Sequence, residues 1–418
     1  MSGQQPAAAR QVRVELPRLL ERLQQLGAVG ALPGGGVCRL ALTDDDRRGR
    51  DLVVGWMREL GMQVSVDGIG NVVATRPGRE ALPAVMTGSH IDTVRTGGLY
   101  DGNLGVLAGL EVVAALNDAG VTTRRPLQVA FFTNEEGARF APDMMGSLVF
   151  QGDLDLDAAL ATVGIDGETV GACLERIGYR GSAPVGAAAH DLHAYVELHI
   201  EQGPVLDLEG YTIGAVEGVQ GISWTEFSVE GVSNHAGTTP MRLRHDAFYV
   251  AAELVAFARR LALEFGGDQV ATGGFVEVKP NLVNVIPNRV RFTIDLRNTD
   301  EALLVEAERR VHAEFDRLLA AEGVRGERRS LARFAPVAFA PELVELVEAK
   351  ARQRGHRVRR LPSGAGHDAQ IIARMCPAAM VFVPSAGGIS HNIREHTEAA
   401  DLAAGAEVLL DTLLDLLD

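Results

Sequence analysis

The stretch that decides the fold is Leu127-Gln128-Val129-Ala130-Phe131-Phe132-Thr133-Asn134-Glu135-Glu136-Gly137. Its first six residues form an apolar run of the length of a buried strand. Two adjacent carboxylates follow the run almost at once. Because adjacent carboxylates repel each other, this pattern indicates either a chemical use for the pair or a solvated turn.

Similar junctions between strand and polar residues occur elsewhere in the chain. Residues 84–87 are apolar and lead to His90, and a helix is expected from Leu104 to Leu116. Further strands are expected at 195–199 and 379–383, the first containing His199 and the second preceding His391. Strands that alternate with helices and end at reactive residues predict an α/β sheet, with its site in the crevice outside the strand ends.

The N-terminal part of the chain has clear local signals. Residues 13–25 have the apolar spacing of an amphipathic helix, and Thr43 precedes three aspartates as a helix start would. Residues 64–66 and 72–74 are expected to be strands on either side of a glycine-containing turn at 67–70. These elements are expected to belong to the same sheet domain.

The segment from about residue 218 to residue 336 has a different pattern. Residues 224–230, 274–279 and 290–295 alternate like half-exposed strands, whereas 246–265 and 301–322 have the pattern of long helices. Two helices with a few antiparallel strands make a small α+β sandwich. Metal-binding residue types lie on both sides of this segment, so we expect an insertion. The predicted domains are residues 1–217 with 337–418, and residues 218–336.

Composition excludes several classes of function. The 418 residues exceed what one core usually serves, and their formal net charge of −15 argues against nucleic acid or an anionic membrane as partner. Three cysteines (Cys38, Cys173 and Cys376) are too few for a disulfide framework, and no apolar stretch reaches the ~20 residues of a membrane span. Residues 1–13 lack the apolar core of a signal peptide, and the first ten are expected to be disordered. We expect a cytoplasmic protein.

Five short islands of metal-binding residue types are spread along the chain. Imidazole and carboxylate suit Zn²⁺ and neighbouring divalent metals, and one carboxylate can bridge two ions ~3.5–4 Å apart. The islands therefore predict a hydrolytic site with two metals. Their candidate residues are His90 with Asp92, Asp101, Glu135 with Glu136, His199, and His391.

Each island also has a plainer explanation when it is taken alone. The pair His90 and Asp92 fits a polar turn, although the Asp92 carboxylate could instead hold the ring of His90 by a hydrogen bond. Asp101 fits a helix cap as well as a bridging ligand. His199 fits a buried histidine within a strand, and His391 fits an ordinary loop residue. One shared site accounts for all the islands at once.

Three further segments carry candidate substrate contacts. His235 lies in the inserted segment, so it is not counted as a metal ligand, and it could stabilise an oxyanion. Arg297 suits a bidentate clamp on a carboxylate, with a surface salt bridge as the alternative. Residues 363–368 precede a helix, so their backbone amides could bind an anion, and capping of that helix by Asp368 explains the pattern equally well.

Three motifs read His199-Ile200-Glu201-Gln202-Gly203-Pro204, His235-Ala236-Gly237-Thr238-Thr239-Pro240-Met241 and Gly364-Ala365-Gly366-His367-Asp368-Ala369. With them the chain, from about Leu40 to its C-terminus, resembles the aminoacylase/carboxypeptidase-G superfamily of two-metal hydrolases, and within it the hydantoinase/carbamoylase branch. The branch often has Ser-His-Asn-Pro-x-Glu where this chain has Ser390-His391-Asn392-Ile393-Arg394-Glu395, and Tyr100 replaces a commoner Phe. Neither departure removes a candidate ligand.

The resemblance implies a role for each candidate residue. It implies that the metal ligands are His90, Asp101 as the bridge, Glu136, His199 and His391. It implies that Glu135 is the general base and that Asp92 and His235 also take part in catalysis. It implies that the substrate is contacted by Gln202, His235, Asn284, Arg297, Gly366 and His367.

The resemblance also implies an α/β fold of zinc-exopeptidase type, in which a mixed sheet with helices on both faces carries an inserted lid and dimerisation domain. The implied reaction is hydrolysis of the carbamoyl C–N bond of an N-carbamoyl-L-amino acid to L-amino acid, ammonia and CO₂. It would use two divalent ions per subunit, Zn²⁺ first, with Mn²⁺, Co²⁺ or Ni²⁺ as alternatives.

An allantoate amidohydrolase or β-ureidopropionase is the alternative activity, and a dipeptidase or aminoacylase is a weaker one. A catalytically silent relative would have lost Glu135 or a ligand, and none is missing. The expected partners are a small carboxylate substrate and a second copy of the chain. The strand 224–230 and the helix from Asp246 are expected at the dimer surface.

Overall fold

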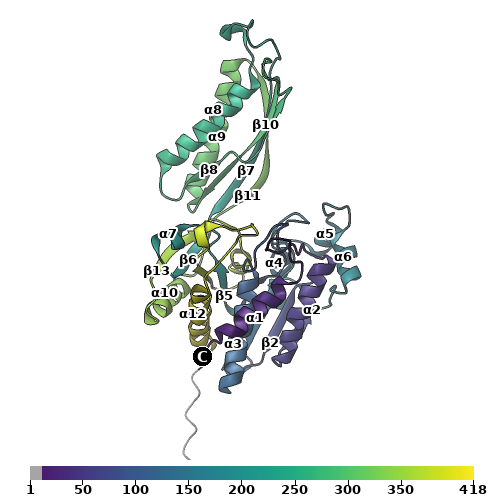
Figure 1. Ribbon diagram of the computed structural model, residues 1–418, viewed down its shortest axis with the longest axis vertical. Coiled ribbons are helices and arrows are strands. Elements are labelled where there is room, and N and C mark those ends of the chain that lie inside the picture. The colour runs from purple at the N-terminus through teal and green to yellow at the C-terminus, as the bar shows by residue number, and fades with distance from the viewer. Residues whose placement is uncertain (1–11) are drawn as a thin grey trace, which may run out of the picture. The chain divides into compact units, whose positions relative to one another are not determined.

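The computed structural model describes residues 12–418 (Figure 1). The prediction of disorder over the first ten residues lies outside this range. The chain divides into two compact units, Met1–Glu217 with Phe339–Asp418, and Gly218–Ala338. No helix among the described residues is long and apolar enough to cross a membrane.

A nine-stranded mixed sheet forms the centre of the first unit. Its strand order is β1-β2-β4-β3-β5-β14-β6-β12, and β13 pairs with β6. The strands are β1 (Gln63–Val66), β2 (Val72–Arg76), β3 (Ala84–His90), β4 (Leu127–Phe132), β5 (Leu192–Ile200), β6 (Ile213–Val219), β12 (Val337–Ala338), β13 (Val358–Ser363) and β14 (Ala378–Val383).

Helices flank this sheet (Figure 1). They are α1 (Leu16–Gly27), α2 (Asp44–Glu59), α3 (Asn103–Ala119), α4 (Met145–Gln151), α5 (Leu156–Ala161), α6 (Val170–Ile177), α7 (Val205–Glu209), α10 (Pro341–Gln353), α11 (Asp368–Ile372) and α12 (Ala399–Leu417). The predicted α/β class is confirmed.

The middle of the sheet is parallel and buried. β3 pairs in parallel with both β4 and β5, and β14 pairs in parallel with β5. β3 and β14 are buried along their whole length, which explains their continuous apolar runs. Helix α3 is buried on nearly all sides and contacts β3, α1 and α12. The carboxyl ends of β3, β4, β5 and β14 therefore meet at one edge of the sheet.

The second unit is a five-stranded antiparallel sheet with two long helices, in the order β11-β7-β10-β8, with β9 also paired to β10. Its elements are β7 (Gly221–Glu230), α8 (Ala247–Phe265), β8 (Val270–Thr272), β9 (Val276–Lys279), β10 (Arg289–Asn298), α9 (Glu301–Glu322) and β11 (Arg325–Phe334). Figure 1 shows α8 and α9 side by side against the sheet. The core between them includes Phe227, Phe292 and Phe315, so the predicted α+β sandwich is confirmed.

The prediction that the strand 224–230 lies at a dimer surface stays a prediction. This strand belongs to β7, which is hydrogen-bonded to β10 along one edge and to β11 along the other. Its backbone is therefore not open to a second chain. The outer strand is β11, which is exposed along most of its length.

Candidate metal centre

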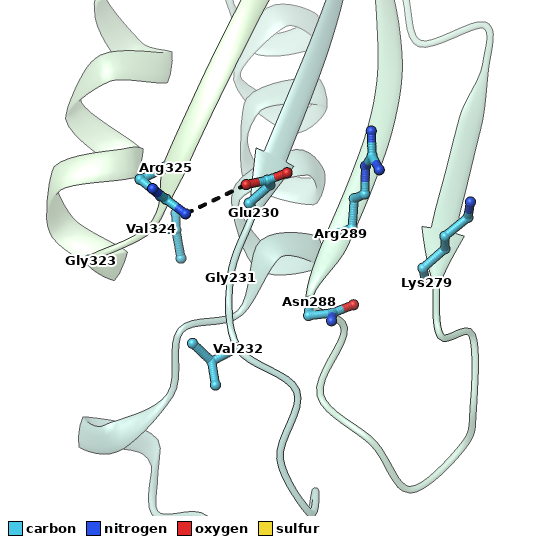
Figure 2. Close-up of a pocket in the computed structure, with 9 residues that line it drawn as sticks. All are labelled: Glu230, Gly231, Val232, Lys279, Asn288, Arg289, Gly323, Val324 and Arg325. Atoms are coloured by element: carbon cyan, nitrogen blue, oxygen red, sulfur yellow. Dashed lines mark ion pairs between the residues drawn. The ribbon is translucent and has the colours of Figure 1, made fainter.

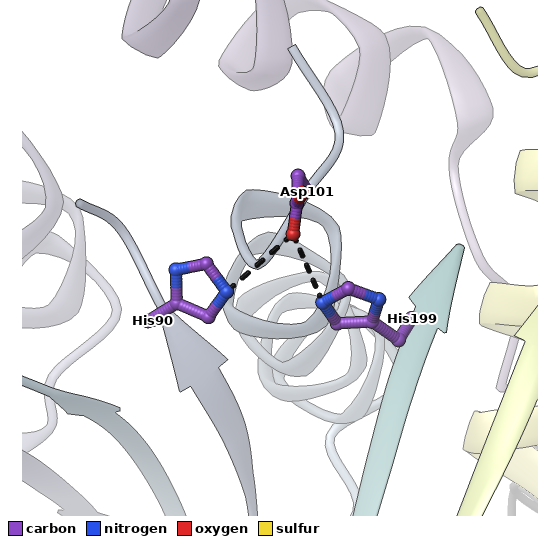
Figure 3. Close-up of side chains that lie close together, drawn as sticks. All are labelled: His90, Asp101 and His199. Atoms are coloured by element: carbon purple, nitrogen blue, oxygen red, sulfur yellow. Dashed lines mark ion pairs between the residues drawn. The ribbon is translucent and has the colours of Figure 1, made fainter. Parts of the chain in front are cut away.

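Two histidines converge on one carboxylate at the carboxyl ends of β3 and β5 (Figure 3). His90 ends β3, His199 lies near the end of β5, and Asp101 lies in the loop before α3. The Nε2 atoms of His90 and His199 lie 3.5 and 3.3 Å from the Oδ1 atom of Asp101. All three side chains are buried. Parallel pairing of β3 and β5 brings the two histidines together.

A second group of donors shares the same aspartate. The Nε2 atom of His391 lies 3.3 Å from the Oδ2 atom of Asp101 and 3.4 Å from the Oε2 atom of Glu136. Each of the two groups, one of His90, Asp101 and His199 and one of Asp101, Glu136 and His391, could hold a metal ion. The structure thus brings all five predicted ligands together and turns one oxygen of Asp101 toward each group.

The donor chemistry fits divalent cations. Two ligand atoms that share a tetrahedral ion through bonds of about 2.0–2.2 Å lie ~3.3–3.6 Å apart, the range of the separations described above. Imidazole nitrogen and carboxylate oxygen suit Zn²⁺, Mn²⁺, Co²⁺ and Ni²⁺. The Nδ1 atoms of His90 and His199 lie 2.9 Å from the backbone oxygens of Asp92 and Ile200. These carbonyls accept the Nδ1 protons, so each Nε2 atom faces Asp101 and could ligate a metal ion once it is deprotonated.

Asp92 has a different role from the one expected. Its carboxylate oxygens accept the backbone N–H groups of Glu135 and Glu136 at 3.3 and 3.4 Å. The hypothesis that this carboxylate holds the ring of His90 is wrong, because the Asp92 backbone oxygen does so. Asn134, with φ of 57°, makes the tight turn after β4, and its side-chain amide donates to the backbone oxygens of Phe140 and Pro142. Asp92 and Asn134 together fix the turn that carries both glutamates.

Glu135 lies beside the donor groups without belonging to either. Its Oε2 atom is 3.5 Å from the Nε2 atom of His90, and its side chain is buried. Burial raises the pKa of Glu135 well above its ordinary value, His90 opposes this, and Asp368 and Glu136 add to it. A carboxylate with a raised pKa next to a metal position is suited to proton transfer.

The other titratable groups shift according to their neighbours. Burial alone would raise the pKa of Asp101, but hydrogen bonds from His199, His391 and His90 lower it well below its ordinary value. Burial raises the pKa of Glu136 to about 8. The hydrogen bond with Asp101 raises the pKa of His391 to about 9. Protons would therefore balance the clustered carboxylates whenever no metal ion is bound.

The predicted substrate residues of the first unit border this centre. The Nε2 atom of Gln202 donates to the Oδ2 atom of Asp101 at 2.9 Å. The His367 ring stands edge-on to His199 at 4.6 Å between centroids, and its Nε2 atom lies 2.9 Å from the Oγ atom of Ser363. Burial lowers the pKa of His367 well below its ordinary value, so this ring is neutral. Gly366 precedes it, close to Met144.

The segment 363–368 differs in part from expectation. Asp368 does not cap α11, because Glu197 accepts the N–H of Ala369 at 2.9 Å instead. The N–H of Ala365 donates to the Oγ atom of Ser363, so one of the amides considered for anion binding already has an acceptor. Glu197 also accepts the Ser89 hydroxyl at 2.6 Å. A carboxylate within the apolar strand β5 was the sequence signal for this buried contact.

The predicted contacts of the second unit lie at opposite ends of β10. His235 forms a bridge with Val285, and the N–H of Ala236 donates to the backbone oxygen of Asn284, both beyond the Arg289 end of the strand. Arg297 lies at the other end, ~26 Å away along the strand at about 3.3 Å per residue. The structure therefore brings His235 and Asn284 together and separates Arg297 from them.

His235 and Arg297 both have defined hydrogen bonds. The Nδ1 atom of His235 accepts the N–H groups of Gly237 and Thr238 at 3.1 and 3.2 Å, so the ring N–H is on Nε2. Arg297 forms an ion pair with Asp295 at 2.9 Å, and its Cζ atom lies 5.8 Å from the ring centroid of Trp224. His235 can thus present a hydrogen-bond donor, and Arg297 is held on the open face of the sheet.

A cavity of about 460 Å³ lies at the Arg289 end of this sheet (Figure 2). Lys279, Arg289 and Arg325 line it, together with Glu230, which pairs with Arg325 at 3.7 Å. None of the predicted site residues lines this cavity.

Comparison with known proteins places the chain among hydrolases. Residues 86–415 match the model of peptidase family M20/M25/M40. An N-carbamoyl-L-amino-acid amidohydrolase from Rhizobium meliloti is 42% identical over 96% of this chain and 97% of its own length. An N-carbamoyl-L-amino acid amidohydrolase from Geobacillus stearothermophilus is 39% identical over 96% of this chain and 98% of its own length. The crystal structure of a hydantoinase/carbamoylase family amidase from Burkholderia multivorans has 45% identity and a TM-score of 0.94, covering 97% of this chain and 98% of that one.

Proposed function

Because the chain belongs to peptidase family M20/M25/M40, we propose that it is a metal-dependent amidohydrolase that cleaves the carbamoyl C–N bond of N-carbamoyl-L-amino acids. The products would be an L-amino acid, ammonia and CO₂. The observation that carries the proposal is the arrangement around Asp101, whose two oxygens face two donor groups with Glu135 beside them. The names of the two relatives support the substrate class.

We propose two divalent ions, Zn²⁺ first, with Mn²⁺, Co²⁺ or Ni²⁺ as alternatives. His90 and His199 would hold one, Glu136 and His391 the other, and Asp101 both. When bound, the ions would lower the pKa of a water and polarise the carbonyl under attack.

The residues of the chain would then handle the protons. Glu135 would accept the proton of the attacking water and deliver it to the leaving amine, which its raised pKa favours. Asp92 would support this step, because it holds the backbone amide of Glu135 and so limits the movement of the base. Glu136 lies one residue further along the same turn and stays with His391.

Substrate contacts would come from both units. The Nε2–H of His235 would donate to the carbonyl oxygen that develops charge. Arg297 would grip the substrate carboxylate with Asn284, and Gln202, Gly366 and His367 would line the site beside the metals. In this proposal residues 1–217 and 337–418 form the catalytic domain. Residues 218–336 form the lid and dimerisation domain of a cytoplasmic homodimer.

A substrate panel tests the activity. The protein is stripped of metal, reloaded with Zn²⁺ or Mn²⁺, and assayed with N-carbamoyl-L-amino acids, allantoate, N-carbamoyl-β-alanine and dipeptides. We expect the highest kcat/KM for an N-carbamoyl-L-amino acid and loss of activity on chelation. Higher kcat/KM for allantoate or for a dipeptide would contradict the proposed substrate class.

A further inference from the structure

Glu395 joins two loops that are far apart in the sequence. Its side chain is only 6% exposed. One oxygen, Oε1, accepts the backbone N–H groups of Tyr100 and Asp101 at 3.1 and 3.3 Å. The other, Oε2, lies 3.2 Å from the hydroxyl of Ser390. The first loop carries the shared aspartate of the metal centre, and the second carries His391.

The loop before Asp101 is shaped around this carboxylate. A Cβ atom added to Gly98 would lie 2.0 Å from the Oε1 atom of Glu395, so no side chain fits there without displacing it. Asp101 lies between the end of β3 at His90 and the start of α3 at Asn103, so neither element holds its backbone. The hydrogen bonds that Glu395 accepts therefore fix the backbone of Asp101, while the Asp101 side chain stays available to the two groups of metal-binding residues.

The second loop needs a similar constraint. His391 has φ of 53°, which is the left-handed region that non-glycine residues seldom adopt. Ile393 stands where a proline would stiffen the backbone, and it packs against the backbone of Gly36 instead. Glu395 ties this loop to residues 100 and 101 through Ser390.

The Ser390 hydroxyl connects the two carboxylates. Its Oγ atom lies 3.2 Å from Oε2 of Glu395 and 3.3 Å from Oδ2 of Asp101. One hydroxyl has one proton, so it can donate to only one of them at a time. A metal ion held by Asp101 would turn this proton toward Glu395. The hydrogen bond from Ser390 to Glu395 would then be stronger when metal is bound.

We propose that Glu395 is a positioning residue that fixes Asp101 and the His391 loop relative to each other. The group of Asp101, Glu136 and His391 is then assembled before metal binds. The proposal rests on the two-metal centre of the proposed function. It concerns the group formed by Asp101, Glu136 and His391, because only this group draws ligands from both loops that Glu395 joins. Loss of the hydrogen bonds of Glu395 should weaken metal binding by that group more than metal binding by His90, Asp101 and His199.

Metal titration of the whole protein tests this without any substrate. Stepwise Kd values for Zn²⁺ are measured by competition with a chromophoric chelator. Glu395→Ala should raise the Kd of the weaker step about 10- to 100-fold, the range seen when residues that orient ligands are lost. Glu395→Gln should stay close to wild type, because its amide oxygen can accept the same N–H groups and its NH₂ can donate to Ser390.

Glu398→Ala is the matched control. Glu398 lies three residues further on, its side chain is 72% exposed, and it contacts His396. It should leave both Kd values unchanged. If Glu395→Ala does not fold, Glu395→Asp replaces it, because the shorter carboxylate keeps the charge but cannot reach both loops. It should show the same weakening.

Three outcomes would overturn the proposal. These are wild-type affinity in Glu395→Ala, equal weakening of both steps together with a lower Tm, or the same weakening in Glu398→Ala, which would indicate a general effect of charge. Binding of one ion by the wild-type protein would instead overturn the two-metal centre on which the proposal rests. Failure of the substrate panel would leave these Kd values untouched, so the two proposals fail separately.

Discussion

Glu135 and Glu136 are neighbours in sequence, yet their carboxylates face different partners. Glu136 contacts His391 within a donor group, whereas Glu135 contacts His90 and belongs to no group. We predict that Glu135→Gln lowers kcat by about 10²- to 10⁴-fold, because the amide cannot accept a proton. Bound metal should stay at two ions per chain, as measured by elemental analysis.

Glu136→Gln serves as the comparison for that experiment. It should release one ion, because an amide is a poor replacement for a metal-binding carboxylate. If Glu135→Gln loses metal while Glu136→Gln keeps it, the roles of base and ligand are exchanged.

Arg297 should distinguish charged from neutral substrates. A carboxylate held by a charged hydrogen-bonding fork contributes roughly 1.5–3 kcal/mol. We predict that Arg297→Ala lowers kcat/KM about a hundredfold toward carboxylate substrates and changes little toward the corresponding amides. Arg297→Lys should still raise KM, because it keeps the charge and loses the fork.

Arg291 provides the control for Arg297. It lies on the same face of β10 and is paired with Glu277 at 3.2 Å. Arg291→Ala should leave kcat/KM unchanged. Equal losses on charged and neutral substrates in Arg297→Ala would mean that Arg297 only stabilises the second unit.

Strong local signals predicted most elements that position the site. The helix 301–322 was placed within its observed bounds, and the strand before Glu135 was found because its apolar run is bounded by polar residues. β13 was missed, because its two arginines and a proline hide the strand pattern. The pairing of β7 on both edges was also beyond reach, since sheet order depends on contacts between distant segments.

The candidate site was predictable where the type of side chain itself indicates metal binding. Histidines and carboxylates after strands indicated the five donors. The residues that hold them were not indicated, because their hydrogen bonds cross large sequence separations. Glu395 reaches Asp101 in this way, and Arg39 reaches the loop after His90. The role of Asp92 was misjudged because the backbone oxygen and the carboxylate of one residue cannot be told apart by spacing.

A substitution at Arg39 tests whether buried hydrogen bonds hold the elements around β3 together. Its side chain is fully buried, and it donates to the backbone oxygens of Leu26, Val29 and Ile91 and to Asn103. Burial lowers the pKa of Arg39 to about 10, so the cation persists at neutral pH. We predict that Arg39→Met lowers the free energy of unfolding by about 3–5 kcal/mol, because it leaves buried acceptors without donors. Urea denaturation measures the change.

Arg47 is the matched exposed arginine. Its side chain is 54% exposed and lies 3.7 Å from Asp51. Arg47→Met should change the free energy of unfolding by less than about 0.5 kcal/mol. Similar losses in both variants would mean that the buried hydrogen bonds of Arg39 add little to stability.

The affinity of the first unit for metal ions should depend on pH. In the metal-free protein the hydrogen bond with Asp101 raises the pKa of His391 to about 9, and burial raises that of Glu136 to about 8. An ion must displace these protons, so its apparent affinity should rise with pH by up to about tenfold per unit for each proton and level off above pH 9. Calorimetry in buffers of different ionisation enthalpy would count the protons released.

The sign for stability follows from the same pKa shifts. The stabilisation that His391 gives the metal-free fold is complete below its unfolded pKa of about 6.5 and is lost as the pH rises through about 9. The raised pKa of Glu136 acts in the same direction, with stabilisation complete below its unfolded pKa of about 4.3 and lost as the pH rises through about 8. The increase in Tm on adding Zn²⁺ should therefore grow between pH 6.5 and 9. An increase that stays constant over this range would contradict the protonated metal-free centre.

The separation of His235 from Arg297 along β10 bears on assembly. One second unit cannot bring both residues to a single small substrate, because ~26 Å of strand lies between them. If both contact the substrate, two chains must contribute to each site. Helix α8 offers a surface for such pairing, because it exposes Phe248 and Tyr249. We therefore predict a homodimer whose sites take His235 from one chain and Arg297 from the other.

Mixing two impaired variants, assayed with a carboxylate substrate, tests this arrangement. In a dimer of His235→Ala with Arg297→Ala, one site has lost both residues and the other has both intact. Random exchange at equal concentrations should restore about a quarter of the wild-type sites, since half of the dimers are mixed. Two tags would verify that mixed dimers form. Mixed dimers without recovered activity, or a monomer by light scattering at micromolar concentration, would mean that each chain builds its site alone. One of the two residues would then have no contact with the substrate.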